Sequence, residues 1–213
     1  MRETDFQLSS EGTPGIQELY ATLAKDEKRN RLILDDVIQA LDQGASPILL
    51  TERKDHLDYF AGQLMKFARH LVVLQGGMSA KERRSVREQL AAIPNHEERL
   101  VLATGRYIGE GFDDARLDTL FLALPVSWKG TLIQYTGRLH RLHPGKSEVR
   151  IFDYVDRDVP MLLRMFEKRL RGYRSIRYAR GEAPLGYAEP ADEVTVERDE
   201  DVLRSLKELD EFT

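Results

Sequence analysis

The sequence predicts an α/β protein in which helices cover both faces of a parallel β-sheet. Two observations lead to this prediction. Short apolar runs of strand length alternate with amphipathic, helix-length segments along residues 30–175. In addition, the 213 residues are 41% hydrophobic and 32% charged, which suits one globular core and excludes a disordered chain. In sheets of this kind, the loops that carry function lie at the carboxyl ends of the strands.

Residues 1–29 are expected to form an extension or linker ahead of the main domain. Residues 1–14 lack apolar periodicity, although a helix is expected to begin near Gly15. From Asn30, apolar side chains repeat at helical spacing, and Gly44 marks the end of this amphipathic helix. The main domain is therefore expected to begin at residue 30.

Strands and helices then alternate along the domain. Strands are predicted over residues 48–50, 71–74, 100–103, 118–122 and 149–155. Helices are predicted around residues 57–64, 79–90, 128–142 and 159–173. Ser79 and Glu82 have the spacing of a capping box, which places the start of one of these helices. This order predicts consecutive βαβ units.

The charge is unevenly distributed along the chain. The net charge is −4, but residues 182–213 hold 11 acidic and three basic residues, a net of −8, so residues 1–181 carry +4. We therefore expect an acidic tail over residues 181–213, after a domain that spans residues 30–180. Between Arg164 and Arg180, seven arginine and lysine residues accompany one acidic residue, Glu167. Such a cluster could contact phosphates, and a solvated helix face explains it equally well.

Composition also excludes several kinds of site. The chain has no cysteine, which excludes disulfides and thiolate metal sites. No apolar run reaches the roughly 18 residues of a membrane span, and the first residues lack a signal-peptide pattern. His140 and His143 have no third ligand at a matching offset, so no metal site is predicted. A cytoplasmic protein without a membrane partner is expected.

The strongest functional signal is the segment QYTGRLHR. On a helix, Gln134, Arg138 and Arg141 share one face, and Gly137 allows close approach beside them. An isolated pair of arginines on a helix is usually a solvated surface. Here, however, a predicted strand lies upstream and leads into GEGFDD, residues 109–114, whose glycines suit a loop that approaches a ligand closely.

Taken together, these segments resemble the motifs of superfamily two helicases. LVLATGRYIGEGFDDARLDTLFLALP followed by QYTGRLHR is similar to motifs V and VI. Upstream, SPILLTERKDHLDYFAGQL resembles motif IV, and LQGGMSAKERR resembles the segment that follows it. The resemblance covers about residues 30–175 and is nearest to the helicase subunits of restriction-type and phage-related systems. It implies a RecA-like fold for the predicted parallel sheet.

The resemblance also implies a role for each motif residue. Arg138 and Arg141 would be arginine fingers that stabilise charge on the γ-phosphate of ATP, with Gln134 orienting them. The residues implied to line the nucleotide are Gly109, Gly111 and Asp113. Those implied to contact the nucleic-acid backbone are Thr51, Arg53 and Thr104, with Gly77, Lys81 and Arg84 as weaker candidates.

ATP and Mg²⁺ would be held mainly by a separate N-terminal RecA-like lobe. The run Gly145–Ser147 has the ending of a P-loop, but His140 stands where the pattern G-x-x-x-x-G-K-S requires its first glycine. We expect this run to be a turn before the last strand. Without a P-loop, the isolated chain is not expected to hydrolyse ATP.

The sequence thus predicts the second motor lobe of an ATP-dependent helicase or translocase. Its expected partners are the N-terminal lobe and single- or double-stranded nucleic acid, with DNA favoured over RNA. The alternative is a non-catalytic nucleic-acid-binding or regulatory module with a RecA-like fold, which the intact Arg138 and Arg141 argue against. A nucleotide-sugar transferase lobe, another doubly wound fold, would leave both arginines unexplained.

Overall fold

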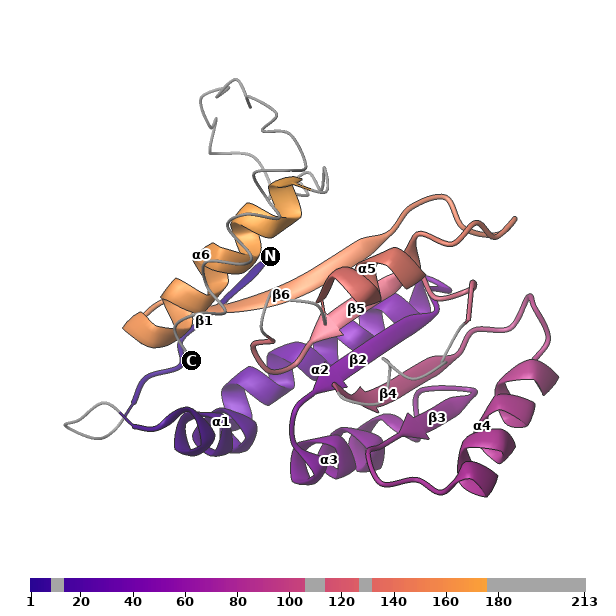
Figure 1. Ribbon diagram of the computed structural model, residues 1–213, viewed down its shortest axis with the longest axis horizontal. Coiled ribbons are helices and arrows are strands. Elements are labelled where there is room, and N and C mark those ends of the chain that lie inside the picture. The colour runs from indigo at the N-terminus through magenta and orange to yellow at the C-terminus, as the bar shows by residue number, and fades with distance from the viewer. Residues whose placement is uncertain (9–13, 106–113, 127–131, 176–213) are drawn as a thin grey trace. The chain divides into compact units, whose positions relative to one another are not determined.

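Six parallel strands form a single sheet in the computed structural model, which describes residues 1–8, 14–105, 114–126 and 132–175 (Figure 1). The strand order is β1-β6-β5-β2-β4-β3. The strands are β1 (Arg2–Thr4), β2 (Pro47–Thr51), β3 (Leu71–Leu74), β4 (Leu100–Thr104), β5 (Thr119–Leu122) and β6 (Arg150–Asp156). Contacts between residues divide the chain between Arg180 and Gly181, and everything described below belongs to the first unit.

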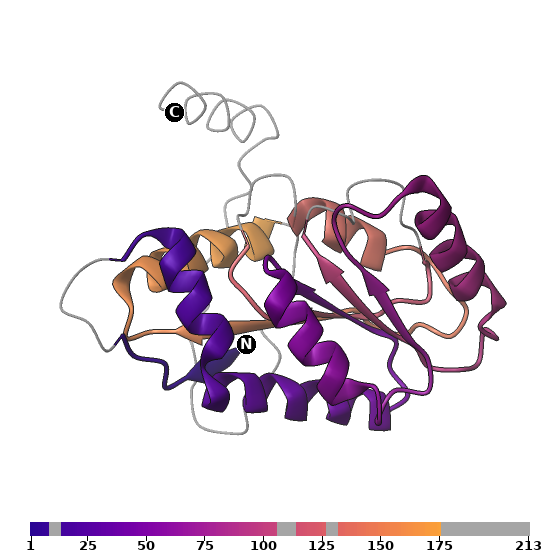
Figure 2. The ribbon, with the colours of Figure 1, turned by 90° about the horizontal axis from the view of Figure 1, so that it is seen from below.

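Helices cover both faces of this sheet. They are α1 (Ile16–Lys25), α2 (Glu27–Asp42), α3 (Lys54–Leu64), α4 (Ala80–Ala92), α5 (Ile133–Leu139) and α6 (Pro160–Ser175). Helices α2 and α3 lie on one face, whereas α4, α5 and α6 lie on the other (Figure 2). The predicted α/β fold with a parallel sheet between two helical layers is therefore confirmed. None of the described helices is long and apolar enough to cross a membrane.

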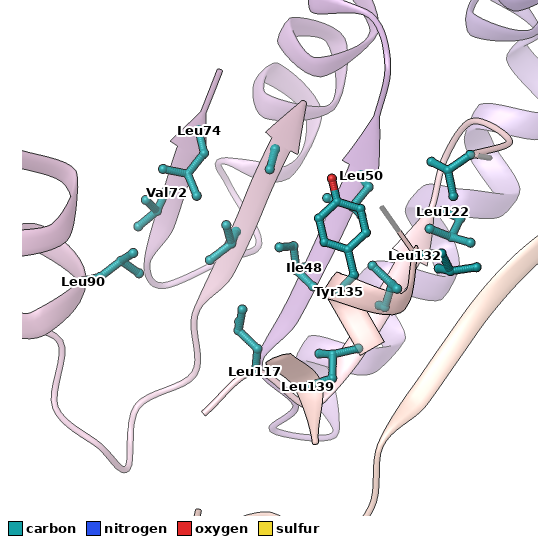
Figure 3. Packing of buried hydrophobic residues seen from close by; sticks show 14 of the residues in the cluster. Ile48, Leu50, Val72, Leu74, Leu90, Leu117, Leu122, Leu132, Tyr135 and Leu139 are labelled. Carbon is teal, nitrogen blue, oxygen red and sulfur yellow. The ribbon is translucent and has the colours of Figure 1, made fainter. Parts of the chain in front are cut away.

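Alternating strand residues explain why helices must cover both faces. Leu49 and Phe121 pack with α2 and α3, whereas their neighbours Ile48 and Leu50 point to the opposite face. On that opposite face, Tyr135 from α5 is packed against the strand residues (Figure 3). Because successive side chains of a strand point to opposite faces, these wholly apolar strands need a helical layer on each side.

The N-terminal residues differ from the expected extension or linker. Arg2–Thr4 pair with β6 as an edge strand, and the Thr4 hydroxyl donates to Asp156 Oδ1 (2.5 Å). Arg2 forms an ion pair with Asp36 of α2. This first strand has only three residues, and its partners are distant in sequence, so no local periodicity signals it. Residues 1–29 are thus part of the same compact unit as the main domain.

Candidate functional site

The carboxyl ends of three neighbouring strands bring several of the predicted contact residues together. Thr51 and Thr104 end β2 and β4 in register, and the loop after β3 lies beside them. Thr104 Oγ1 accepts a hydrogen bond from the amide of Gly76 (3.0 Å). Arg53, Gly77 and Thr104 are therefore grouped at one edge of the sheet, as expected for a parallel sheet.

Thr51 does not fit its predicted role. Its side chain is fully buried (0% exposed), and its hydroxyl lies 3.0 Å from His56 Nδ1. Helix α3 covers the end of β2, so no part of this side chain can reach a ligand. Thr51 is therefore a positioning residue and not a contact residue.

Thr51 instead belongs to a buried hydrogen-bond relay that sequence reasoning missed. The amide of Arg53 donates to Thr51 Oγ1 (3.4 Å), and His56 Nε2 lies 2.9 Å from Asn30 Oδ1. Asn30 Nδ2 donates to the carbonyl of Ala24 (2.9 Å). When His56 is neutral and protonated at Nε2, the Thr51 hydroxyl donates to Nδ1 and Nε2 donates to Asn30 Oδ1. Every hydrogen bond of the relay then has one donor and one acceptor. The relay ties the α1–α2 junction to the loop that carries Arg53.

His56 is expected to make the stability of the fold depend on pH. Burial, with a smaller contribution from the Arg29 guanidinium, lowers the pKa of His56 to about 3, whereas an unfolded histidine titrates near about 6.5. As pH falls below about 6.5, the unfolded chain takes up a proton that the folded chain does not. The free energy of unfolding should therefore fall by at most about 1.4 kcal/mol per pH unit from this group.

Substituting glutamine (His56→Gln) should remove this contribution. Urea unfolding of both proteins between about pH 7 and about pH 5 measures the difference in slope. The same change at His96, which is exposed, is the control and should leave the slope unaltered. Identical slopes for His56→Gln and the unmodified protein would contradict a buried neutral histidine.

Arg53 lies beside an open hollow at the carboxyl end of β2. The hollow has a volume of about 560 Å³ and is lined by Gln17, Glu52, Arg53, Lys54, Asp55 and Asp58. Arg53 donates to both carboxylate oxygens of Asp55, at 3.0 Å and 2.7 Å. The hydrogen bond from Arg53 is the main cause that lowers the pKa of Asp55. Arg53 is thus held in one orientation at the edge of the sheet, with part of its side chain exposed.

The loop after β3 and the first turn of α4 place the remaining backbone candidates. Gly77 has a φ of 86°, a left-handed conformation that favours glycine. The predicted capping box at the start of α4 is present, since the amide of Ser79 donates to Glu82 Oε2 (2.6 Å) and the amide of Glu82 donates to Ser79 Oγ (3.3 Å). This cap fixes the first turn of α4, where Lys81 is exposed.

Helix α5 carries the arginine motif and is tied to the end of β4. The hydroxyl of Tyr135 donates to the carbonyl of Gly105, the residue that follows β4. The Glu52 carboxylate lies against Gly105 and would have to move if position 105 carried a Cβ. Burial raises the pKa of Tyr135, which keeps the hydroxyl protonated as a donor. Motif VI and the end of the motif V strand are thereby linked directly.

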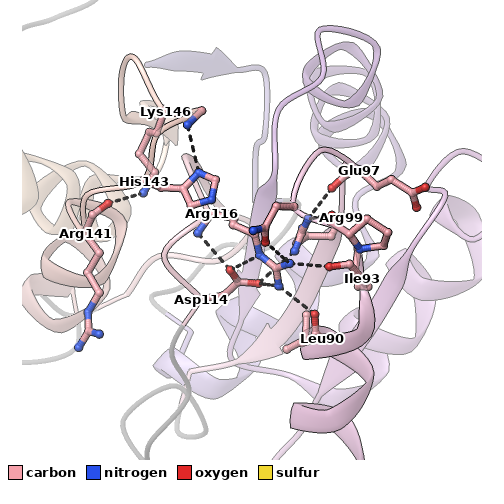
Figure 4. Close-up of polar contacts among 12 residues, drawn as sticks. Leu90, Ile93, Glu97, Arg99, Asp114, Arg116, Arg141, His143 and Lys146 are labelled. Atoms are coloured by element: carbon pink, nitrogen blue, oxygen red, sulfur yellow. Dashed lines mark hydrogen bonds and ion pairs between the residues drawn. The ribbon is translucent and has the colours of Figure 1, made fainter.

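The opposite end of α5 is held by Lys146. Its Nζ donates to the carbonyl of Leu139 (2.7 Å), the last residue of the helix, and to that of Arg141 (3.0 Å), just after it. Figure 4 shows Arg141 and Lys146 in this region. A cation that donates to terminal carbonyls is a stabilising C-cap. The glycine-lysine-serine run therefore serves as the predicted turn before β6, and its lysine closes the motif helix.

The motif helix is shorter than predicted. Helix α5 ends at Leu139, and Arg141 follows the C-cap residue His140, with its amide donating to the carbonyl of Arg138 (3.2 Å). Arg138 is partly exposed and Arg141 is exposed. Gln134 lies in the first turn of α5, and its side chain lies outside the part that the structure describes.

Arg141 and the strand contacts occupy different parts of the domain, whereas Arg138 lies near Tyr135, whose hydroxyl bonds the residue after β4. Helix α5 runs from Tyr135, beside the carboxyl end of β4, to Leu139, beside Leu117 ahead of β5 (Figure 3). Arg141 therefore lies toward the amino ends of the strands, away from Arg53. The nucleotide-loop candidates Gly109, Gly111 and Asp113 lie outside the described residues.

A buried ionic cluster anchors the chain directly after that loop. Asp114 accepts two hydrogen bonds from the guanidinium of Arg116, at 2.7 Å and 2.8 Å, and a third from its amide at 3.1 Å. Arg116 also donates to the carbonyls of Leu90 (2.9 Å) and Ile93 (2.8 Å) at the end of α4 (Figure 4). Arg99, fully buried, lies 3.7 Å from Asp114. The cluster joins residues 114–116 to α4, and no local sequence pattern indicates it.

The described residues supply cations rather than a metal site. Across the described ranges, no group of three or more histidine or carboxylate side chains could hold a metal ion. Two groups of described residues could bind an anionic ligand. Arg138 and Arg141 lie in or next to α5, and Arg53, Lys81 and the Gly77 loop lie at the carboxyl edge. Both groups suit phosphate charges.

Comparison with known proteins agrees with the resemblance in the sequence. Residues 29–143, more than half of the chain, match the family described as helicase conserved C-terminal domain. The chain is 28% identical over 170 residues to Transcript termination protein A18 of fowlpox virus (strain NVSL), which covers 78% of this chain and 35% of that protein. It is 29% identical over 121 residues to Transcript termination protein A18 of vaccinia virus (strain Ankara), which covers 56% of this chain and 24% of that protein. The chain thus spans only part of the length of these relatives.

Solved structures share the fold at lower identity. UvsW of T4 aligns with a TM-score of 0.60 and 18% identity, over 76% of this chain and 35% of that chain. The SWI2/SNF2 ATPase core domain of Sulfolobus solfataricus aligns with a TM-score of 0.55 and 17% identity, over 76% of this chain and 34% of that chain. These likenesses establish the fold alone. The family match shows that the chain belongs to the helicase conserved C-terminal domain family, and the structural likenesses agree with its RecA-like fold.

Proposed function

We propose that this chain is the second motor lobe of an ATP-dependent nucleic-acid helicase or translocase. The observation that carries the proposal is the mounting of α5. Tyr135 ties one end of this helix to the end of β4, and Lys146 closes the other end. Arg138 and Arg141 thus lie on a short segment that is held at both ends. Groups that stabilise a charge developing in a transition state need to be fixed in position in this way.

Arg138 and Arg141 would meet the γ-phosphate of ATP held mainly by an N-terminal RecA-like lobe. That lobe would also hold Mg²⁺, because the described residues offer no metal site. Bound ATP supplies the phosphoryl group that is transferred to water. The two guanidiniums would bind its oxygens and stabilise charge in the transition state. The isolated chain is accordingly not expected to turn over ATP.

Nucleic acid would lie against the carboxyl edge of the sheet. Arg53, Lys81 and the Gly77 loop would contact backbone phosphates, and the Thr104 hydroxyl positions that loop. Such contacts carry little sequence information. We propose DNA as the substrate, single- or double-stranded, and a cytoplasmic site of action without a membrane partner.

The isolated chain is expected to bind single-stranded nucleic acid weakly and in a salt-dependent way. Replacing Arg53 and Lys81 together by alanine should weaken binding and reduce the slope of log affinity against log salt by about 1.4, since each phosphate contact contributes about 0.7. Fluorescence anisotropy of a labelled oligonucleotide across a salt series measures the slope.

The matched control replaces two exposed lysines elsewhere, Lys28 and Lys66, by alanine. It removes the same charge and should change the slope little. Absence of binding by the unmodified chain at low salt, or binding indifferent to salt, would contradict the nucleic-acid role.

A further inference from the structure

Helix α6 presents a row of cations that the proposed contacts do not use. Arg164, Lys168, Arg171 and Arg174 are exposed and stand four, three and three residues apart, so they share one side of the helix. Within the described part of the chain, their side chains make no hydrogen bond or ion pair. Some exposed arginines elsewhere do have a carboxylate partner, as Arg84 has in Glu88 (2.8 Å). Among the described residues of α6, the four cations of this row face one exposed carboxylate, Glu167, so the row has a net positive charge there.

The opposite side of α6 is fixed in the core. Arg169 Nε and one terminal nitrogen donate to the two carboxylate oxygens of Asp153 at 2.7 Å and 2.9 Å, and the Tyr173 hydroxyl donates to the same carboxylate (3.0 Å). Leu162 and Phe166 are also buried. Of the basic residues that cluster in the sequence here, Arg169 is thus structural. The anchored face determines that the row points outward.

We propose that the α6 row binds the phosphodiester backbone of a nucleic acid, as a second contact surface of the lobe. This inference rests on the proposed nucleic-acid function. At about 1.5 Å per residue, Arg164 to Arg174 span about 15 Å. One strand of a duplex presents a phosphate about every 3.4 Å along its axis, so the row lies alongside about four phosphates. The cations stand about 6, 4.5 and 4.5 Å apart along the helix, so the row matches a run of phosphates in charge and in length rather than in spacing.

The position of α6 supports the same partner. The helix begins four residues after β6 ends, so its first turn lies at the carboxyl edge where the other contacts are proposed. From that edge, the row would extend the proposed nucleic-acid contact surface toward the side of the sheet that holds β6. Its apolar residues Leu162 and Phe166 are committed to the core, and the exposed side has no large apolar group to insert into a membrane.

The test is a salt series with the 213-residue chain and a labelled DNA duplex. The row variant replaces Arg164, Lys168 and Arg171 by glutamine. The slope of log affinity against log salt should fall by about 2 to 3, because each lost phosphate contact contributes about 0.9. Replacing Arg164 and Arg171 by lysine should preserve the slope, since a phosphate contact of this kind needs a charge rather than a planar fork.

The control replaces Lys28, Arg31 and Lys66 by glutamine, three exposed cations of α2 and the end of α3. It changes the net charge equally and should alter the slope by less than about 1. A row variant with the slope of the control overturns this inference and leaves the proposed function standing. No binding by the unmodified chain overturns both. If polyglutamate displaces the duplex from the unmodified chain at equal charge concentration, the row is a site for an acidic protein instead.

Discussion

Replacing Arg138 or Arg141 by alanine in the two-lobed protein is expected to lower ATP turnover by about 10³- to 10⁵-fold, with ATP affinity nearly unchanged. An arginine finger acts on charge that appears mainly in the transition state, so its loss is felt in turnover more than in ground-state binding. An exposed ion pair contributes only about 0 to 1 kcal/mol, against roughly 4 to 7 kcal/mol for a finger. The size of the effect therefore separates the motor from a non-catalytic binding module.

Two further variants sharpen this prediction. Lysine at either position should restore little activity, because an ammonium cannot reproduce the paired hydrogen bonds of a guanidinium. Arg150→Ala is the control, since Arg150 lies in β6 outside the motif and contacts Gln43 (2.9 Å) and Glu148 (3.4 Å). Steady-state turnover and nucleotide affinity are measured for each protein. Near-normal turnover in both alanine variants would show that α5 is an ordinary surface helix.

Replacing Asp153 by alanine is expected to lower the free energy of unfolding by about 3 to 5 kcal/mol. Asp153 of β6 accepts hydrogen bonds from Arg169 and Tyr173, and all three side chains are buried. Removing the carboxylate leaves a buried guanidinium without its counter-charge. Urea unfolding followed by circular dichroism measures the change.

The control for Asp153→Ala is a change at an exposed ion pair. Arg84→Ala breaks the contact with Glu88, in which both side chains are largely exposed, and should change stability by less than about 1 kcal/mol. A second test replaces Arg169 by methionine in the Asp153→Ala background. Removing the orphaned cation should recover part of the lost stability, because apolar replacements of whole buried pairs are often tolerated. A loss below about 1 kcal/mol for Asp153→Ala would contradict the role of this pair.

Local signals in the sequence were sufficient to predict most of the fold. The strand predicted at residues 71–74 coincides with β3 because a glycine turn follows the apolar run. Ser79 and Glu82 marked the start of α4 because a capping box depends only on residues three apart. The strand β1 was not predictable in this way, since its pairing with β6 and the contact of Arg2 with Asp36 join distant parts of the chain.

The candidate site residues that belong to contiguous sequence motifs could be predicted from the sequence. The arginines of α5 and the position of Arg53 after β2 follow from such motifs. Thr51 was assigned wrongly, because its position at a strand end did not reveal that α3 buries it. The Lys146 cap and the bond from Arg116 to the carbonyl of Leu90 depend on how separate elements pack, which no local spacing encodes.

The most direct test of the central claim is the affinity of the two-lobed protein for ADP with aluminium fluoride, measured relative to ADP alone. This complex mimics the transferring phosphoryl group, so its extra affinity reports transition-state stabilisation. We predict that Arg138→Ala and Arg141→Ala lose most of that extra affinity but bind ADP normally, whereas Arg150→Ala retains both. Tight binding of the analogue by both alanine variants would contradict the assignment of this chain as the lobe that supplies the arginine fingers.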